Sequence, residues 1–295
     1  MKRFEYFAPV EISEALKYLE SYGDAAKLLA GGTDLLIQLK NNEIKPSYLI
    51  DLKKIQELKG IKFSVEEGLR LYPLTTISEI EASQVIENYF PIVSQAIKTI
   101  GSIQIRNRAT VGGNLCRAAP SADLVPPLLV LDAQLKIRNF YNEKIIKLEE
   151  FFVGPGKTIL KNNEILTEIM ISNVSNKRLG IYLKHGYRQT MELAIVGMAV
   201  LMDFDHQRCI CKDVKIALGS VAPTPLRAKE AENTLKGEKI TQDIIEKAGK
   251  VASEEINPIT DVYGPDWYKR DIVKVMLKRA IMILQGKIKD QKNET

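Results

Sequence analysis

The chain has few of the residues that build disulfide or metal sites. Its 295 residues include three cysteines, Cys116, Cys209 and Cys211, without a repeated Cys-x-x-Cys spacing, and two histidines, His185 and His206. An odd number of thiols at these spacings builds neither a paired disulfide framework nor a four-thiolate metal site. Cys209 and Cys211 alternate onto one face of a strand, but no third ligand lies near them. We predict no metal site, and we expect Cys116 to be a small buried thiol.

Long apolar runs and charge of one sign are also absent. The 42 Lys and Arg residues face 37 Asp and Glu residues, and both kinds are spread along the chain. A nucleic-acid partner is therefore disfavoured. No run reaches the roughly 18 apolar residues of a membrane span, and the opening MKRFEYFAPVEISEAL becomes acidic before a signal-peptide core can form. We expect a cytoplasmic protein without a membrane span.

The order of elements predicts an α+β fold. Ser13 is expected to cap a first helix that Gly23 ends, and a small β-α-β unit follows. Later strands are expected at 61–65, 69–74, 133–139, 144–148, 164–172, 180–188, 193–204 and 209–221, and the last of three final helices at 266–286. We expect a first domain at 1–175 with subdomains of about 1–57 and 58–175, a C-terminal α+β domain at 176–286, and a frayed tail at 287–295.

Two glycine pairs each follow a short apolar run and lead into a polar residue. The first is in KLLAGGTDLL, where Ala30, Gly31 and Gly32 precede Thr33 and Asp34. Glycine lets another atom approach bare backbone, and consecutive amides in such a turn favour an anion. Thr33 and Asp34 are expected to cap the next helix or bond a ligand hydroxyl.

The second pair, in ATVGGNLCRAAPSADLVP, repeats this arrangement from Thr110 to Asn114. One such loop is often only a tight turn, but two suggest a diphosphate held from both sides. Neither loop reads Gly-x-Gly-x-x-Gly, so the Rossmann fingerprint is absent. GPGKT at 154–158 lacks the first glycine of a P-loop, and we interpret it as a turn.

Longer segments carry a family resemblance. They are FEYFAPVEISEAL, LLAGGTDLL, IGSIQIRNRATVGGNLCRAAPSADLVPPLLVLDAQL, FFVGPGKTIL and YLKHGYRQTMELAIVGMAV. Together they resemble the FAD-binding medium subunits of the molybdenum hydroxylases, the group that includes the medium subunit of carbon monoxide dehydrogenase and the flavin domain of xanthine dehydrogenase. The resemblance covers nearly the whole chain. It implies a two-subdomain FAD-binding domain like that of vanillyl-alcohol oxidase, followed by a small α+β C-terminal domain.

The resemblance also implies positions for the cofactor. Leu29 to Leu35 (Leu29, Ala30, Gly31, Gly32, Thr33, Asp34, Leu35) would wrap one side of the FAD pyrophosphate, and Thr110, Val111, Gly112, Gly113 and Asn114 the other. Asp123 would bind flavin or ribityl groups, with Ile100 and Gly101 passing along the flavin. Lys184 and the stretch from Met191 to Ile195 would approach the isoalloxazine. Other interpretations stay open: Asp123 as a helix cap, Asn114 as a turn former, and Lys184 as a solvated charge.

By the same resemblance, the chain oxidises no organic substrate itself, and no catalytic side chain is expected. A large subunit would carry the molybdenum cofactor, and [2Fe-2S] clusters of a small subunit would deliver electrons to FAD in this chain. NAD+ or another acceptor would take them from the flavin. The resemblance further implies that the three subunits assemble as a dimer of heterotrimers. Two alternatives remain, a self-contained flavin oxidase and a non-enzymatic nucleotide-binding module.

Overall fold

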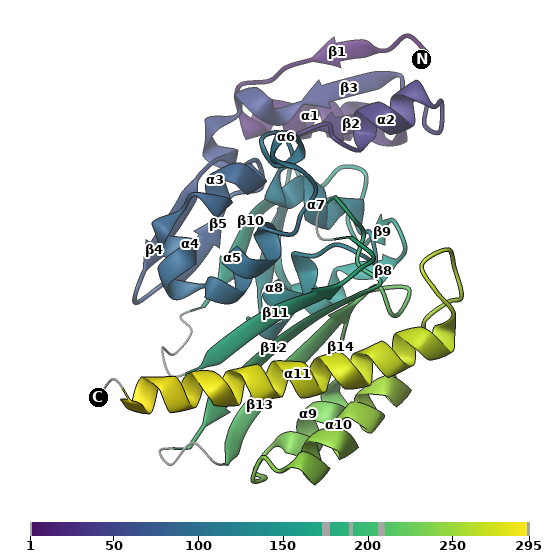
Figure 1. Cartoon of the computed structure of the whole chain (residues 1–295). Coiled ribbons are helices and arrows are strands. Elements are labelled where there is room, and N and C mark those ends of the chain that lie inside the picture. Colours follow the sequence, from purple (N-terminus) through teal and green to yellow (C-terminus); the bar gives the residue numbers. More distant parts are fainter. Residues whose placement is uncertain (1, 173–177, 189–190, 206–209, 294–295) are drawn as a thin grey trace. The chain divides into compact units, whose positions relative to one another are not determined.

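The computed structural model describes residues 2–172, 178–188, 191–205 and 210–293, with side chains described to residue 286 (Figure 1). Contacts divide the chain into two compact units. The first comprises Met1–Ser83, Gly101–Ala118 and Ala133–Asn173, and the second comprises Gln84–Ile100, Ala119–Asp132 and Val174–Thr295. Each unit has its own sheets and its own buried apolar residues.

The first unit begins with a small parallel sheet. Its strands are in the order β1-β3-β2, and helices follow the first two strands in the chain. The elements are β1 (Glu5–Phe7), α1 (Ile12–Tyr22), η1 (Gly23–Ala25), β2 (Ala26–Leu29), α2 (Leu35–Lys40), β3 (Tyr48–Asp51), η2 (Leu52–Lys54) and η3 (Gln56–Leu58). Helix α1 presents Ala15, Leu16 and Leu19 to a core shared with Ile50. The expected small β-α-β unit is confirmed.

The start of α1 differs from the expectation that Ser13 caps it. The N-cap residue is Glu11, and the Ser13 hydroxyl donates to the Glu11 carboxylate. The free amide of Ile12 instead donates to Oε1 of Glu57 at 2.9 Å. A carboxylate 45 residues away therefore does the capping that a local serine was predicted to do. The predicted end is correct, because Gly23 adopts a φ of 47° that few other residues tolerate.

A five-stranded antiparallel sheet forms the rest of the first unit, in the order β4-β5-β10-β6-β7. Its elements are β4 (Ile61–Ser64), β5 (Gly68–Leu71), β6 (Gln134–Arg138), β7 (Glu143–Lys147) and β10 (Ile165–Ile171), accompanied by α3 (Ile77–Glu81), α6 (Ile103–Arg106), α7 (Val111–Arg117), η4 (Leu148–Glu150), β8 (Phe152–Gly154) and β9 (Lys157–Thr158). Leu135 and Ile137 are buried on one face of β6, whereas Lys136 and Arg138 point to the other face. This alternation is typical of an antiparallel sheet with one face on the core and one in solvent.

The second unit is built on a four-stranded antiparallel sheet with helices on both faces (Figure 1). Its elements are α4 (Gln84–Tyr89), α5 (Pro91–Ile97), α8 (Val125–Val130), β11 (Leu179–His185), β12 (Val196–Phe204), β13 (Cys211–Gly219), β14 (Leu226–Arg227), α9 (Lys229–Leu235), α10 (Gln242–Glu255) and α11 (Asp266–Asn293). Ile181 and alternate residues of β12 join a core with α9, α10 and α11. On the opposite face, Gly180 lies against Ile92 of α5, and Gly219 lies against Pro126 of α8.

The units do not follow the expected order along the chain. Residues 84–100 and 119–132 were placed in the first domain, but they belong to the second compact unit, because α5 and α8 pack on its sheet. Helix α11 continues past Gly286 into the segment expected to be a tail. In the described ranges, we find no helix whose length and hydropathy would let it cross a bilayer.

Candidate functional site

The first glycine loop, between β2 and α2, leaves a row of backbone donors unused. Gly32 has a φ of 77°, a left-handed conformation that favours glycine. Within the part of the chain that the structure describes, none of the N–H groups of residues 31–34 donates a hydrogen bond, whereas Leu36 N–H donates to Gly32 O at 3.2 Å. Successive free amides around a left-handed residue form a concavity suited to an anion. This loop therefore has the donors that a phosphate group needs.

The two glycine loops meet in the first unit. A Cβ atom on Gly31 would lie 2.0 Å from the carbonyl oxygen of Arg108, in the segment that leads into the second loop. A Cβ atom on Gly112 would lie 2.4 Å from Cβ of Pro73. We expected both glycines to open space for a ligand. The structure gives a different reason, because each is pressed against another part of the chain.

The second loop, at the start of α7, has no backbone donors left for a ligand. The N–H groups of all four residues from Val111 to Asn114 donate within the chain. Their acceptors are Thr75 O for Val111 (3.0 Å), Pro73 O for Gly112 (2.9 Å), Thr110 Oγ1 for Gly113 (3.1 Å) and Thr110 O for Asn114 (2.9 Å). The two loops are therefore not equivalent, and the expected grip by amides from both sides has support from the first loop only.

One side-chain atom of the second loop remains unpartnered. Oδ1 of Asn114 is buried and accepts no hydrogen bond from the described residues. A buried acceptor without a donor is costly, so such an atom in a folded protein calls for an explanation. A ligand that brings a hydroxyl or N–H group to Asn114 would satisfy it. The free amides of the first loop and this acceptor are the features that fit a phosphate-containing cofactor with polar groups.

Asp34 does not cap α2, although it occupies the N-cap position. Its Oδ2 accepts from Gln38 Nε2 at 2.7 Å and pairs with Arg117 Nε at 2.7 Å. Arg117 was not among the expected site residues, although it lies only three positions after Asn114. Its guanidinium neutralises a carboxylate beside the first loop, where a negative charge would repel a phosphate. The adjacent Thr33 is half-buried, and its hydroxyl makes no hydrogen bond to another described residue.

The remaining residues of the first loop serve packing. Leu29 is buried with Leu39 and Leu49, and Leu35 packs against this cluster. Ala30 packs against the neighbouring core of the first unit. The buried side chain of Leu29 and the half-buried side chains of Ala30 and Leu35 therefore help to hold the loop in place.

Asp123 and Lys184 belong to the second unit, where they bind each other. Lys184 Nζ lies 2.7 Å from Oδ2 of Asp123, and the Tyr182 hydroxyl donates to Oδ1 of Asp123 at 2.7 Å. Lys184 Nζ also donates to the carbonyls of Thr99 at 3.1 Å and Glu192 at 2.7 Å. All three ammonium donors are thus used. Lys184 is not the solvated charge that its alternating strand suggested, and Tyr182, two residues earlier on the same strand face, was missed.

Burial governs the protonation of this cluster. It raises the pKa of the Asp123 carboxyl, and the Lys184 ammonium and the Tyr182 hydroxyl offset only part of that rise. Burial and the neighbouring carboxylate raise the pKa of Tyr182 well above its ordinary range. Removing a carboxylate from water is costly unless a cation and donors accompany it. Through these contacts, Asp123, which precedes α8, is held next to strand β11.

Other expected positions are placed as follows. Ile100 is buried and Gly101 has a φ of 49°. In the stretch from Met191 to Ile195, Met191 and Leu193 are exposed. Cys116 is exposed as a residue, whereas burial of its thiol raises the pKa of that group to about 12. Cys209 and His206 lie outside the described residues, so the expectation that Cys209 and Cys211 share one strand face falls outside them too.

Comparison with known proteins relates the whole chain to flavoprotein subunits. Residues 2–173 match the FAD binding domain in molybdopterin dehydrogenase, and residues 181–284 match the CO dehydrogenase flavoprotein C-terminal domain. The chain belongs to the FAD-binding medium subunits of the molybdenum hydroxylases. The resemblance read from the sequence, and the fold and FAD cofactor that it implied, are thereby confirmed.

Individual relatives cover almost all of this medium subunit. The glyceraldehyde dehydrogenase medium chain of Sulfolobus acidocaldarius is 30% identical, over 94% of this chain and 96% of that protein. The xanthine dehydrogenase FAD-binding subunit of Escherichia coli O157:H7 is 28% identical, over 94% of each. The solved carbon monoxide dehydrogenase of Hydrogenophaga pseudoflava, which lacks the Mo-pyranopterin moiety of its cofactor, superposes with a TM-score of 0.90 at 32% identity, over 95% of this chain and 96% of that one. This medium subunit is therefore an oxidoreductase component.

Proposed function

We propose that this medium subunit takes electrons from [2Fe-2S] clusters of a small partner subunit onto FAD and passes them to NAD+ or another acceptor. The observation that carries the proposal is full-length similarity to medium chains of several dehydrogenases, joined to a loop with free amides in the FAD-binding domain. FAD supplies chemistry that accepts electrons singly and releases them in pairs. No side chain of this chain is assigned as an acid or base.

The residues have separate roles in this proposal. The free amides at Gly31, Gly32 and Thr33 bind the FAD diphosphate, and Arg117 keeps Asp34 from repelling it. Asn114 accepts a hydrogen bond from a polar group of FAD. The remaining loop residues, Leu29, Ala30 and Leu35 with Thr110 to Gly113, hold these groups in position through packing and internal hydrogen bonds.

Asp123 and Lys184 have a different role from the direct flavin contact that the resemblance implied. Their mutual pairing supports a positioning role, in which the ammonium fixes the carbonyl of Glu192 and so the neighbouring stretch from Met191 to Ile195. A polar contact from Asp123 to the flavin would have to compete with two hydrogen bonds already made.

The partners in this proposal are a large subunit with the molybdenum cofactor and a small iron-sulfur subunit, assembled as a dimer of heterotrimers in the cytoplasm. Several relatives are named medium chains, a term that presupposes larger and smaller companions. The organic substrate is then selected by the large subunit. The domain limits 1–175 and 176–286 remain our proposal for the division along the chain between flavin binding and the C-terminal part, although residues 84–100 and 119–132 pack with the second compact unit.

A test uses the chain co-expressed with its two partner subunits. Anaerobic addition of the complex's organic substrate should bleach the flavin absorption, and NAD+ or an artificial acceptor should restore it. A control complex lacking the small subunit should keep FAD but fail to bleach. Bleaching of equal rate in the medium subunit alone would instead support the self-contained oxidase and overturn the proposal.

A further inference from the structure

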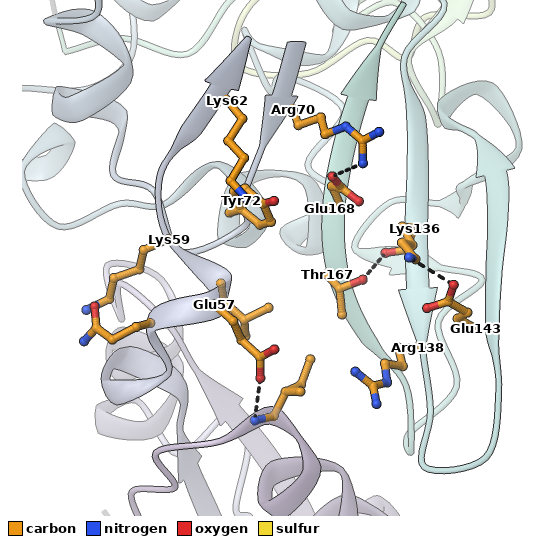
Figure 2. A pocket seen from close by; sticks show the side chains of 13 residues that line it. Glu57, Lys59, Lys62, Arg70, Tyr72, Lys136, Arg138, Glu143, Thr167 and Glu168 are labelled. Carbon is orange, nitrogen blue, oxygen red and sulfur yellow. Dashed lines mark hydrogen bonds and ion pairs between the residues drawn. The ribbon is translucent and has the colours of Figure 1, made fainter. Parts of the chain in front are cut away.

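A hollow on the open face of the five-stranded sheet is lined by cations (Figure 2). It has a volume of about 460 Å³ and lies wholly within the first unit, between the segment around η3 and strands β5, β10 and β6. Its lining includes five cationic side chains, Lys59, Lys62, Arg70, Lys136 and Arg138. Volumes of about 300–1,000 Å³ are typical of small-molecule sites. The glycine loops contribute no residue to it.

Three carboxylates in the lining are already engaged. Glu168, which is buried, pairs with Arg70 at 3.1 Å, and Glu143 pairs with Lys136 at 3.0 Å. Glu57 accepts the hydrogen bond from the first amide of α1. Glu57 keeps its negative charge, so the lining sets five cations against three carboxylates and has an excess of two positive charges.

The other three cations have no carboxylate partner among the described residues. Lys59 and Arg138 are exposed on opposite sides of the hollow, and Lys62 lies over the ring of Tyr72, 5.3 Å from its centroid. On a solvated sheet face, positive and negative side chains usually lie next to each other, as Arg70 and Lys136 lie next to their carboxylate partners here. Three unpaired cations that surround one hollow instead favour an occupant that carries several negative charges.

A second, smaller hollow extends the first. It has a volume of about 310 Å³ and shares Lys62, Arg70 and Tyr72 with it. The shared residues make a continuous trough along β4 and β5, and the second hollow also contributes the Glu67 carboxylate, which lies 3.6 Å from the Arg70 guanidinium. An occupant with charges in a row would contact Arg138 and Lys59 at one end and Lys62 at the other.

We infer that this trough is a second anion site, separate from the flavin loops, that binds a compact polyphosphate group of the nucleotide triphosphate class. A chain of linked phosphates places several charges within the length of the hollow, and Lys59, Lys62 and Arg138 supply the counter-charges. The ring of Tyr72 completes the lining and offers an apolar surface for the rest of such a molecule, whereas the neighbouring Ile12 and Leu58 are buried in the core.

The experiment is calorimetric titration of the FAD-loaded protein with sodium tripolyphosphate, and separately with ATP. The parent protein should bind tripolyphosphate at a single site. The double variant Lys62→Gln, Arg138→Gln should bind at least about tenfold more weakly, because two charge-assisted contacts are lost. Neither side chain makes a hydrogen bond to another described residue, and Lys62 only lies over the ring of Tyr72, so the variant should keep its FAD and its melting temperature.

Two control variants distinguish specific binding in the trough from general electrostatic attraction to the protein surface. Lys147→Gln removes the same charge from the same sheet face but outside the lining, and it should leave the affinity unchanged. Glu143→Gln removes a carboxylate from the lining and should tighten binding. Tighter binding of ATP than of tripolyphosphate would indicate that the apolar lining is also used, and equal binding that the phosphates alone are recognised; both support the inference.

Three results would overturn it. One is the absence of binding to the parent protein at millimolar tripolyphosphate. Another is equal weakening by Lys147→Gln and by the double variant. The third is tighter binding of a hexaglutamate peptide than of tripolyphosphate, which would assign the trough to an acidic protein segment.

Discussion

Replacing Lys184 with methionine tests whether Lys184 stabilises the fold or binds the flavin directly. Methionine keeps the length and apolar stem of lysine but removes the ammonium. The side chains of Lys184 and Asp123 are only 12% and 9% exposed, so the variant leaves a buried carboxylate with a single donor, the Tyr182 hydroxyl. Removing one partner of a buried ion pair typically costs about 3–5 kcal/mol. We expect a loss of stability of that size in the protein without FAD.

The dependence of this loss on pH has a definite sign. Burial already raises the pKa of Asp123, and loss of the ammonium that lowers it raises that pKa further. A neutral carboxylic acid does not need a cation. The destabilisation by Lys184→Met should therefore be largest at neutral pH and should shrink as the pH falls through the raised pKa of Asp123.

The assay is urea denaturation of the FAD-free protein, for the parent and for Lys184→Met, at several pH values. The double variant Lys184→Met, Asp123→Asn removes both charges and should recover a large part of the loss, which gives the coupling between the two groups. The reasoning would be refuted by an FAD-free variant as stable as the parent whose affinity for FAD is strongly reduced, because Lys184 would then act on the flavin.

Three further changes test the site. Gly31→Ala places a Cβ 2.0 Å from the Arg108 carbonyl and should destabilise the FAD-free protein by about 1–3 kcal/mol or more, whereas Gly154→Ala, with nothing within 4 Å of its Cβ, should not; urea denaturation compares them. Asn114→Ala removes an unpartnered acceptor, so it should leave the melting temperature of the FAD-free protein unchanged and weaken FAD binding about tenfold, as measured by fluorescence quenching. For Asp51, burial raises the pKa, but hydrogen bonds from the lysine two positions on and a tyrosine outweigh it and lower the pKa below 3.8. Its stabilising contribution is present above that value and is lost as the pH falls through the lowered pKa, so Asp51→Asn should flatten the acid limb of the stability curve.

Local signals in the sequence predicted much of the first unit. Gly23 ended a helix because only a left-handed residue fits there, and the alternation in β6 separated a buried face from a charged one. These features depend on neighbours in the chain, which is why they could be read from it.

Contacts between distant residues were the part that could not be predicted. Lys184 and Asp123 are 61 positions apart, and neither residue alone indicates that the other neutralises it. A glycine is needed at position 112 because its backbone packs closely on Pro73, and no pattern in the nearby sequence indicates that contact. Nor does any pattern in residues 84–100 show that α5 packs on a sheet whose four strands all follow residue 178.

The visible absorption spectrum of the purified protein, recorded after incubation with FAD and removal of free flavin, tests the central claim most directly. It should be taken for the parent and for Asn114→Ala, each alone and co-expressed with the partner subunits. We expect the parent to retain flavin absorption and the folded variant to lose much of it on dilution. A parent complex that assembles with its partners but carries no flavin would contradict the account.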